Sequence, residues 1–172
     1  MRTRTPRADA VTRADVLRIR LARAADIPAL VALENRVFAG DRLSARQWRH
    51  HVASPRATIL VATASHGLCG AAIVFFHRGH DIARLYSLAV APEARGQGVG
   101  ERLLAAAERD AARRGSRRMR LEVRRDNPGA QRLYAQRGFR VFDERPRYYE
   151  DGHDALRYEK SLAPQRGGLS PH

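Results

Sequence analysis

The sequence contains a single cysteine, Cys69, in 172 residues. One thiol excludes an internal disulfide and is typical of proteins in the reducing cytoplasm. No apolar run approaches the ~20 residues that a membrane-spanning helix requires, and the N-terminus lacks the apolar segment of a secretory signal. These absences predict a cytoplasmic protein with no membrane partner.

Lysine is almost absent as well, because Lys160 is the only one among 32 Lys and Arg residues. The formal net charge of +14 would suit a nucleic-acid partner. The near-exclusive use of Arg, however, indicates a coding preference spread over the surface. Attraction to acidic substrates or to the phosphates of a cofactor fits better than nucleic acid. The histidines show no metal-ligand spacing, so no metal is expected.

The order of hydrophobic patterns predicts one α/β domain over residues 16–162. Disorder is expected for residues 1–15 and flexibility for residues 163–172. Period-two and β-favouring stretches predict strands at 16–21, 57–63, 68–77, a segment ending at 90, 119–123, 139–142 and 155–162. Capping residues and glycines predict four helices, after Asp26 and Ser44, from the glycine-rich bend to about Arg114, and from Pro128 to Gly138.

The chain is organised around the bend at residues 95–100. A strand ends at Val90, Arg95-Gly-Gln-Gly-Val-Gly100 follows, and a helical pattern begins. This order leaves N–H groups unpaired at the helix start, where they and the helix dipole attract phosphate. The helix leads to another strand, so the one parallel pair of a mixed sheet with helices on both sides is expected there.

Two other glycine-rich phosphate sites fit this bend less well. A P-loop requires Lys and then Ser or Thr after its last glycine, whereas this chain has Glu101-Arg102. A dinucleotide fingerprint should open a βαβ unit early in a longer domain, whereas this bend follows four predicted strands.

The bend, preceded by Leu88-Ala-Val90, resembles the acetyl-CoA-binding segment of the GNAT acetyltransferase superfamily. Downstream stretches resemble the ribosomal-protein alanine N-acetyltransferases and their eukaryotic N-terminal relatives: Leu121-Glu-Val-Arg124, Asn127, Leu133-Tyr134, Gly138-Phe139 and Tyr148-Tyr149-x-Asp151-Gly152-x-Asp154-Ala155. The resemblance covers about residues 81–162. It implies a single-domain, GNAT-like mixed β-sheet flanked by about four helices, with acetyl-CoA as cosubstrate.

The resemblance also implies roles for individual residues. The acetyl and pantetheine part of acetyl-CoA would contact the strand end, at Leu88, Ala89 and Val90. The pyrophosphate would be held by the bend, at Arg95, Gly96, Gln97, Gly98, Val99 and Gly100. The side-chain amide of Asn127 would bind the pantetheine arm.

Glu122 and Tyr134 are the catalytic candidates implied by the resemblance. A protonated amine cannot attack a thioester, so a carboxylate such as Glu122 would remove its proton, and Tyr134 would donate a proton to the departing thiolate. Alternatives remain from the residues alone. Glu122 could be an exposed residue or an ion-pair partner of Arg118 or Arg124, and Tyr134 could be a core residue.

Tyr148, Tyr149 and Phe38 are candidates for acceptor binding, with a packed loop and core packing as the alternatives. The stretch Phe38-Ala39-Gly40-Asp41 lacks the Phe-Pro pattern of the resembled enzymes.

The expected function is direct acetyl transfer to a primary amine of a peptide or protein, either an N-terminal α-amine or a lysine. A small-molecule amine acetyltransferase and a catalytically silent basic binding module remain alternatives. The chain is expected to be a monomer or a homodimer.

Overall fold

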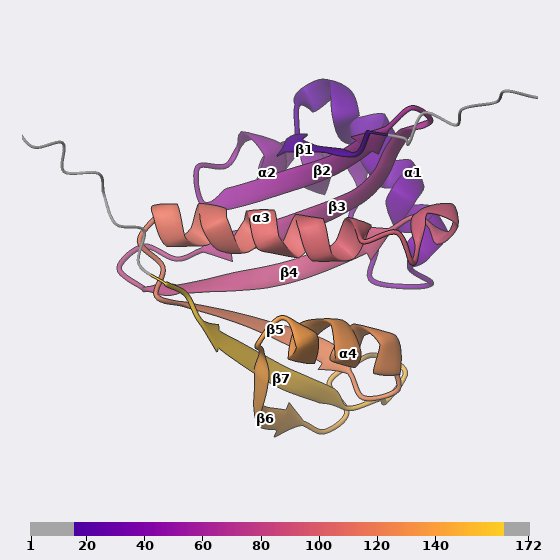
Figure 1. Ribbon diagram of the computed structural model, residues 1–172. Coiled ribbons are helices and arrows are strands. Elements are labelled where there is room, and N and C mark those ends of the chain that lie inside the picture. Colours follow the sequence, from indigo (N-terminus) through magenta and orange to yellow (C-terminus); the bar gives the residue numbers. More distant parts are fainter. Residues whose placement is uncertain (1–15, 164–172) are drawn as a thin grey trace, which may run out of the picture.

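The computed structural model describes residues 16–163, in which a seven-stranded sheet carries helices on both faces (Figure 1). The predicted mixed α/β fold is confirmed. The disorder predicted for residues 1–15 and, apart from residue 163, the predicted flexible tail lie outside the described residues. Within residues 16–163, every helix falls short of the length and apolar character that crossing a membrane requires.

Each predicted strand and helix is present, with boundaries shifted by up to three residues. The strands are β1 (Arg18–Leu21), β2 (Ala57–Ala64), β3 (Gly67–Phe76), β4 (Ile82–Val90), β5 (Arg118–Arg124), β6 (Arg140–Arg145) and β7 (Ala155–Ser161). The helices are α1 (Ile27–Val37), α2 (Ala45–Ala53), α3 (Val99–Arg113) and α4 (Pro128–Gln136). Two short 3₁₀ turns, Ala24–Asp26 and Pro92–Ala94, were not predicted.

The strands lie in the order β1-β2-β3-β4-β5-β7-β6. Every neighbouring pair is antiparallel except β4 and β5, which are parallel and are joined by α3. The predicted single parallel pair across the third helix is therefore confirmed.

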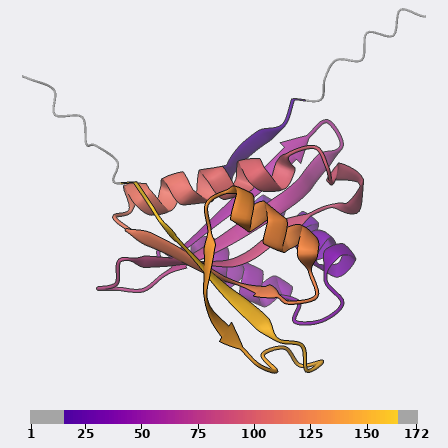
Figure 2. The same cartoon turned by 60° about the horizontal axis from the view of Figure 1, so that its bottom comes forward.

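The helices form one layer on each side of the sheet. Figure 2 shows α3 and α4 on one side, with α1 and α2 on the other. The predicted apolar face of α3 is buried against β2, β3 and β4, and its members are Val99, Leu103, Ala106, Ala107 and Ala111. On β5, residues alternate between buried and half-exposed. One side of β5 therefore faces the core, and the other carries the charged side chains.

Strands β4 and β5 pair only over their first residues. The ladder runs from Ile82 opposite Arg118 to Arg84 opposite Arg120. Beyond it, β4 continues to Val90 while remaining paired with β3, and the two strands diverge toward the glycine-rich bend (Figure 1). The β3–β4 ladder also shifts register between Ile73 and Val74. Such bulges bend a strand and increase its twist, which accounts for the divergence.

The first helix begins where predicted but is not capped as predicted. Asp26 occupies the N-cap position without a side-chain capping bond. Its carboxylate instead accepts hydrogen bonds from the Arg20 guanidinium at 2.7 and 2.8 Å and from the backbone N–H of Arg23 at 2.7 Å. The Arg20 hydrogen bonds lower the pKa of Asp26 to about 2. Asp26 therefore ties β1 to the helix start.

Gly70 of β3 lies close to α3. A Cβ atom there would lie 2.9 Å from Leu103 Cδ1, 3.0 Å from Val99 Cγ1 and 3.1 Å from the Ala89 carbonyl oxygen.

We expect Gly70→Val to lower the free energy of unfolding by about 1–3 kcal/mol through overpacking. Urea denaturation measures this loss. Gly40→Ala, at a site with no atom within 4 Å, is the control and should stay within about 0.5 kcal/mol. Equal stability of the two variants would contradict the close approach.

Candidate active site

The divergence of β4 and β5 is bounded by the glycine-rich bend and by the start of α4. A Cβ atom on Gly100 would lie 3.6 Å from Val90 Cγ2 and 3.5 Å from Leu133 Cδ2. The first turn of α3 therefore touches both the end of β4 and helix α4. These contacts bring the predicted phosphate-binding segment and the predicted catalytic helix to one place.

The bend presents free hydrogen-bond donors. Among the described residues, the backbone N–H groups of residues 96–101 donate no hydrogen bond within the chain; the first helical bond of α3 runs from Arg102 N to Gly98 O. Gly96 and Gly98 have φ angles of +75° and +77°, and nothing lies within 4 Å of the Cβ position of either. An anion can therefore approach these donors closely.

Side chains around the bend fix its path. Glu93 forms a bidentate ion pair with Arg36 of α1, which lowers the pKa of Glu93 to about 2. The Gln97 amide donates to the Glu93 carbonyl at 3.1 Å, and Arg95 Nε donates to the Val90 carbonyl at 3.4 Å. Arg95 and Gln97 thus support the bend from within, and both remain exposed.

Glu122 lies on β5 just beyond the last residue paired with β4. Its carboxylate is largely buried, with 14% of the side chain exposed. Oε2 lies 3.3 Å from the Arg84 guanidinium of β4, and Oε1 lies 3.6 Å from Arg157 Nε of β7. Glu122 is therefore an ion-pair partner, but not of Arg118 or Arg124 as one alternative had it.

Tyr134 of α4 is buried, with 7% of the residue exposed. Its ring packs edge-on against Phe139 at 5.7 Å and lies 6.2 Å from the ring of Tyr158. Burial, with a smaller contribution from Tyr149, raises the pKa of the Tyr134 hydroxyl. Tyr134 thus belongs to the core by packing.

The loop between β6 and β7 brings Tyr148 and Tyr149 to Glu122. The Tyr148 hydroxyl accepts a hydrogen bond of 3.1 Å from Arg84, which also pairs with Glu122. Burial, followed by Tyr148 and Glu122, raises the pKa of Tyr149 to about 12. The structure therefore brings three of the predicted site residues together: Glu122, Tyr148 and Tyr149. Tyr134 lies on α4, next to Leu133, which is close to the first turn of α3.

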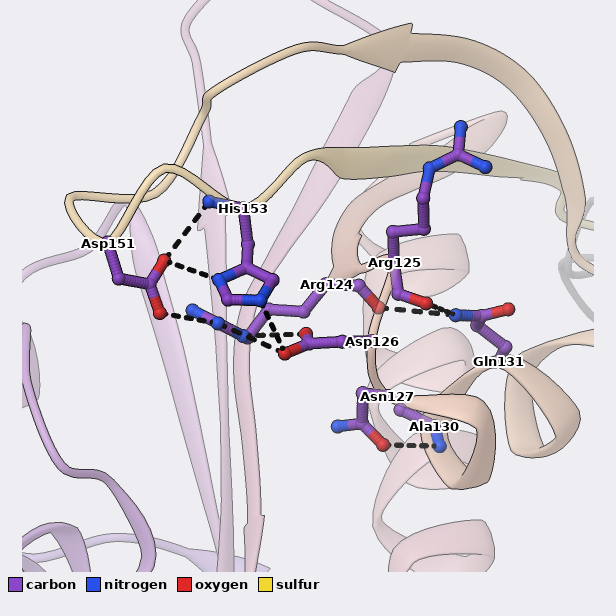
Figure 3. A network of polar contacts seen from close by, with 8 residues as sticks. All are labelled: Arg124, Arg125, Asp126, Asn127, Ala130, Gln131, Asp151 and His153. Carbon is purple, nitrogen blue, oxygen red and sulfur yellow. Dashed lines mark hydrogen bonds and ion pairs between the residues drawn. The ribbon is translucent and has the colours of Figure 1, made fainter.

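A polar network holds this loop to the end of β5 (Figure 3). Arg124 donates to Asp151 at 2.6 Å and to Asp126 at 3.0 Å, and its guanidinium lies 4.8 Å from the Tyr149 ring centre. His153 bridges the same two carboxylates, at 3.1 Å from Asp151 and 3.2 Å from Asp126. The Arg124 hydrogen bonds hold the pKa of Asp151 well below its usual range. Tyr149 is thus held in place by contacts to β5.

Asn127 is the N-cap residue of α4. Its Oδ1 accepts a hydrogen bond from Ala130 N at 3.1 Å (Figure 3). The side chain is exposed, and in Figure 3 its amino group points away from the helix. The amino group therefore faces away from the helix that Oδ1 caps.

Phe38 follows α1 as its C-cap residue. Its side chain is half-buried and packs against the core cluster, as the alternative interpretation expected.

Leu88, Ala89 and Val90 lie on the part of β4 that no longer pairs with β5. Within the described residues, no group of three or more His, Cys, Asp or Glu side chains is arranged to hold a metal ion.

The two arginines that pair with Glu122 were not identified from the sequence. Arg84 precedes Glu122 by 38 positions, and Arg157 belongs to the last strand. In a chain with 32 basic residues, neither arginine stands out by type. Only the register of β5 against β7, in which Glu122 lies opposite Arg157, would have predicted the second pair.

Comparison with known proteins identifies the family of this fold. The acetyltransferase (GNAT) family matches residues 27–139. A Bacillus subtilis (strain 168) protein, provisionally named a ribosomal protein bS18-alanine N-acetyltransferase, is 41% identical over 91 residues, covering 52% of this chain and 57% of that protein. N-alpha-acetyltransferase 30 of Schizosaccharomyces pombe (strain 972 / ATCC 24843) is 36% identical over 83 residues, covering 48% and 55%.

The solved structures agree with these sequence relatives. The crystal structure of the ribosomal-protein-S18-alanine N-acetyltransferase from Escherichia coli is similar with a TM-score of 0.77 at 27% identity, covering 91% of this chain and 100% of that one. The matches to the two curated relatives span little more than half of their lengths. The family match covers more than half of this chain. The chain therefore belongs to the acetyltransferase (GNAT) family.

Proposed function

We propose that the protein is an acetyl-CoA-dependent N-acetyltransferase that transfers acetyl directly to a primary amine of a peptide or protein. The observation that carries this proposal is the divergence of β4 from β5, with unpaired N–H groups of residues 96–101 at one side and Glu122 at the other. This arrangement would hold the phosphates of the donor at the bend and a proton acceptor on β5.

The residues of the bend fit the pyrophosphate of coenzyme A. Six consecutive N–H groups at a helix start, without Cβ atoms at Gly96 and Gly98, suit a doubly charged phosphate group. Residues 88–90 pair with β3 but not with β5, and the edge that faces β5 suits the amide groups of the pantetheine arm. The Asn127 amino group offers a further donor. When bound, acetyl-CoA supplies the activated acetyl group as a thioester.

Glu122 is proposed to accept the proton of the acceptor ammonium, directly or through one water. Its carboxylate borders a cavity of about 220 Å³ on the face of the sheet that carries the charged residues of β5. Arg84 and Arg157 balance its charge and fix its orientation. The neutral amine can then attack, since its lone pair is free. The backbone of residues 88–90 is proposed to stabilise the negative charge that develops on the acetyl oxygen.

Tyr134 is proposed to donate a proton to the departing sulfur. We expect Tyr134→Phe to lower kcat about tenfold. This loss is smaller than the loss usual for removal of a general acid, because a thiolate is a good leaving group even without protonation. A raised pKa keeps the wild-type hydroxyl protonated as pH rises. Wild-type kcat should therefore show no loss from Tyr134 ionisation below about pH 10. Stopped-time assays from pH 6 to 10 measure both effects.

Tyr158→Phe is the control for Tyr134→Phe, because Tyr158 is an adjacent buried tyrosine on β7. It should keep kcat within about twofold. Equal loss in both variants would assign Tyr134 to packing alone.

The names of the relatives favour a protein α-amine as the acceptor. The B. subtilis, S. pombe and E. coli proteins are all named for acetylation of alanine or α-amino groups. The Tyr148-Tyr149 loop, held to β4 by Arg84 and to β5 by Arg124, would form one wall of the acceptor site.

The acceptor is tested by an amine panel with acetyl-CoA. A peptide with a free N-terminus, the same peptide with a blocked N-terminus and an internal lysine, and a polyamine are compared by kcat/KM. We expect the free N-terminus to be preferred. Preference for the polyamine would favour a small-molecule acetyltransferase, and preference for the blocked peptide would assign the activity to lysine.

A further inference from the structure

A basic cavity lies beside Glu122 on the face of the sheet that carries the charged residues of β5. It has a volume of about 220 Å³, roughly seven times the ~30 Å³ that one water occupies. Three guanidinium groups line it, from Arg84, Arg120 and Arg157, with Glu122 as the carboxylate. His77 and His80 of the β3–β4 turn also line it.

The guanidinium groups of this cavity are fixed before any ligand binds. Arg120 and Arg157 lie over the ring of Phe142, at 4.6 and 4.8 Å from its centre. Arg120 also pairs with Glu159 at 2.5 Å, and Arg157 with Asp143 at 3.2 Å. Both side chains are mostly buried, with 29% and 20% exposed. Side chains held in this way lose little conformational freedom when they bind an anion.

Each guanidinium group of the cavity is paired with a carboxylate, but only one of these carboxylates lines the cavity. Glu159 and Asp143, the partners of Arg120 and Arg157, do not line the cavity. Glu122 is the sole acidic side chain lining it, against three arginines. Among the described residues, Arg84 also has a buried Nε without a hydrogen-bond partner. The wall therefore has donors in excess of acceptors.

We infer that this cavity selects acceptors that carry an Asp or Glu side chain close to the reactive amine. The inference rests on the proposed function. Arg120 and Glu122 are two positions apart on β5, which is about 7 Å along a strand. An extended acceptor with its amine at Glu122 therefore places its second or third residue at the cavity. A carboxylate there pairs with the guanidinium groups, while the ammonium group pairs with Glu122.

Three peptides that differ only at positions two and three, as Asp-Asp, Ser-Ser or Lys-Lys, test this specificity. We expect kcat/KM of the wild type to be about tenfold higher for the Asp-Asp than for the Ser-Ser peptide, mainly through KM, and lowest for Lys-Lys. The preference should shrink when ionic strength rises from about 0.05 to 0.5 M, because the charges are partly exposed.

Arg120→Gln and Arg118→Gln form a matched pair of variants. Both residues lie on the same side of β5 and both pair with Glu159, but only Arg120 lines the cavity. Arg120→Gln should reduce the Asp-Asp preference to about twofold or less, and Arg118→Gln should leave it at about tenfold.

Equal kcat/KM for the three peptides, or equal loss of preference in both variants, would overturn the inference and leave the proposed function standing. Acetylation of none of the peptides would instead overturn the proposed function itself.

Discussion

Glu122→Gln is expected to lower kcat/KM by about 10²- to 10⁴-fold, the usual contribution of a positioned general base. The amide keeps the size of the side chain but cannot accept the ammonium proton. Acetyl-CoA affinity should change little, because Glu122 lies on β5 rather than on the bend at residues 95–100. Steady-state kinetics with a peptide acceptor and calorimetry with acetyl-CoA measure the two quantities.

Asp143→Asn is the matched control for Glu122→Gln. Asp143 also pairs with Arg157, at 3.2 Å, but lies on β6 and does not border the cavity. Loss of this ion pair should change kcat/KM by no more than about fivefold. If Glu122→Gln retained the wild-type rate, Glu122 would have no part in proton removal.

Gly98→Val is expected to weaken acetyl-CoA binding by roughly 10- to 100-fold. Gly98 is the N-cap residue of α3 with φ of +77°, a conformation that a β-branched residue adopts only at a cost of about 1–3 kcal/mol. A relaxed backbone would turn the neighbouring N–H groups away from the phosphates, and the new side chain would stand in their path. Isothermal titration calorimetry measures the affinity.

Gly115→Val separates backbone strain from loss of the anion site. Gly115 follows the other end of α3 with φ of +90° and open space around its Cβ position. Both variants should lower the thermal midpoint by similar amounts, and only Gly98→Val should weaken acetyl-CoA binding. Wild-type affinity in Gly98→Val would remove the bend from the cofactor site.

The sequence predicted the glycine-rich bend well because its signals are local. Three glycines, a strand that ends at Val90 and a helical period in α3 are visible within about twenty residues, and all of these features are present. The single parallel pair followed from the α3 crossover. Asp26 was misassigned as a side-chain cap because its true partner, Arg20, was one of many nearby arginines.

The features that complete the candidate site depend on contacts between distant strands. The divergence of β4 from β5 accompanies a register shift opposite β3, and no residue type marks a bulge of this kind. The pairing of Glu122 with Arg84 and Arg157 joins three strands. The basic cavity likewise arises from β4, β5 and β7 together. Local patterns cannot predict which of so many arginines converge on one carboxylate.

The most direct test of the central claim is product stoichiometry with acetyl-CoA and a peptide that has a free N-terminus. The account predicts that free coenzyme A and N-terminally acetylated peptide form in equal amounts, measured together by thiol titration and mass spectrometry. Because the proposed transfer is direct, no acetylated protein should accumulate. Release of coenzyme A without acetylated peptide, or no turnover with any amine alongside tight, salt-sensitive DNA binding, would contradict it.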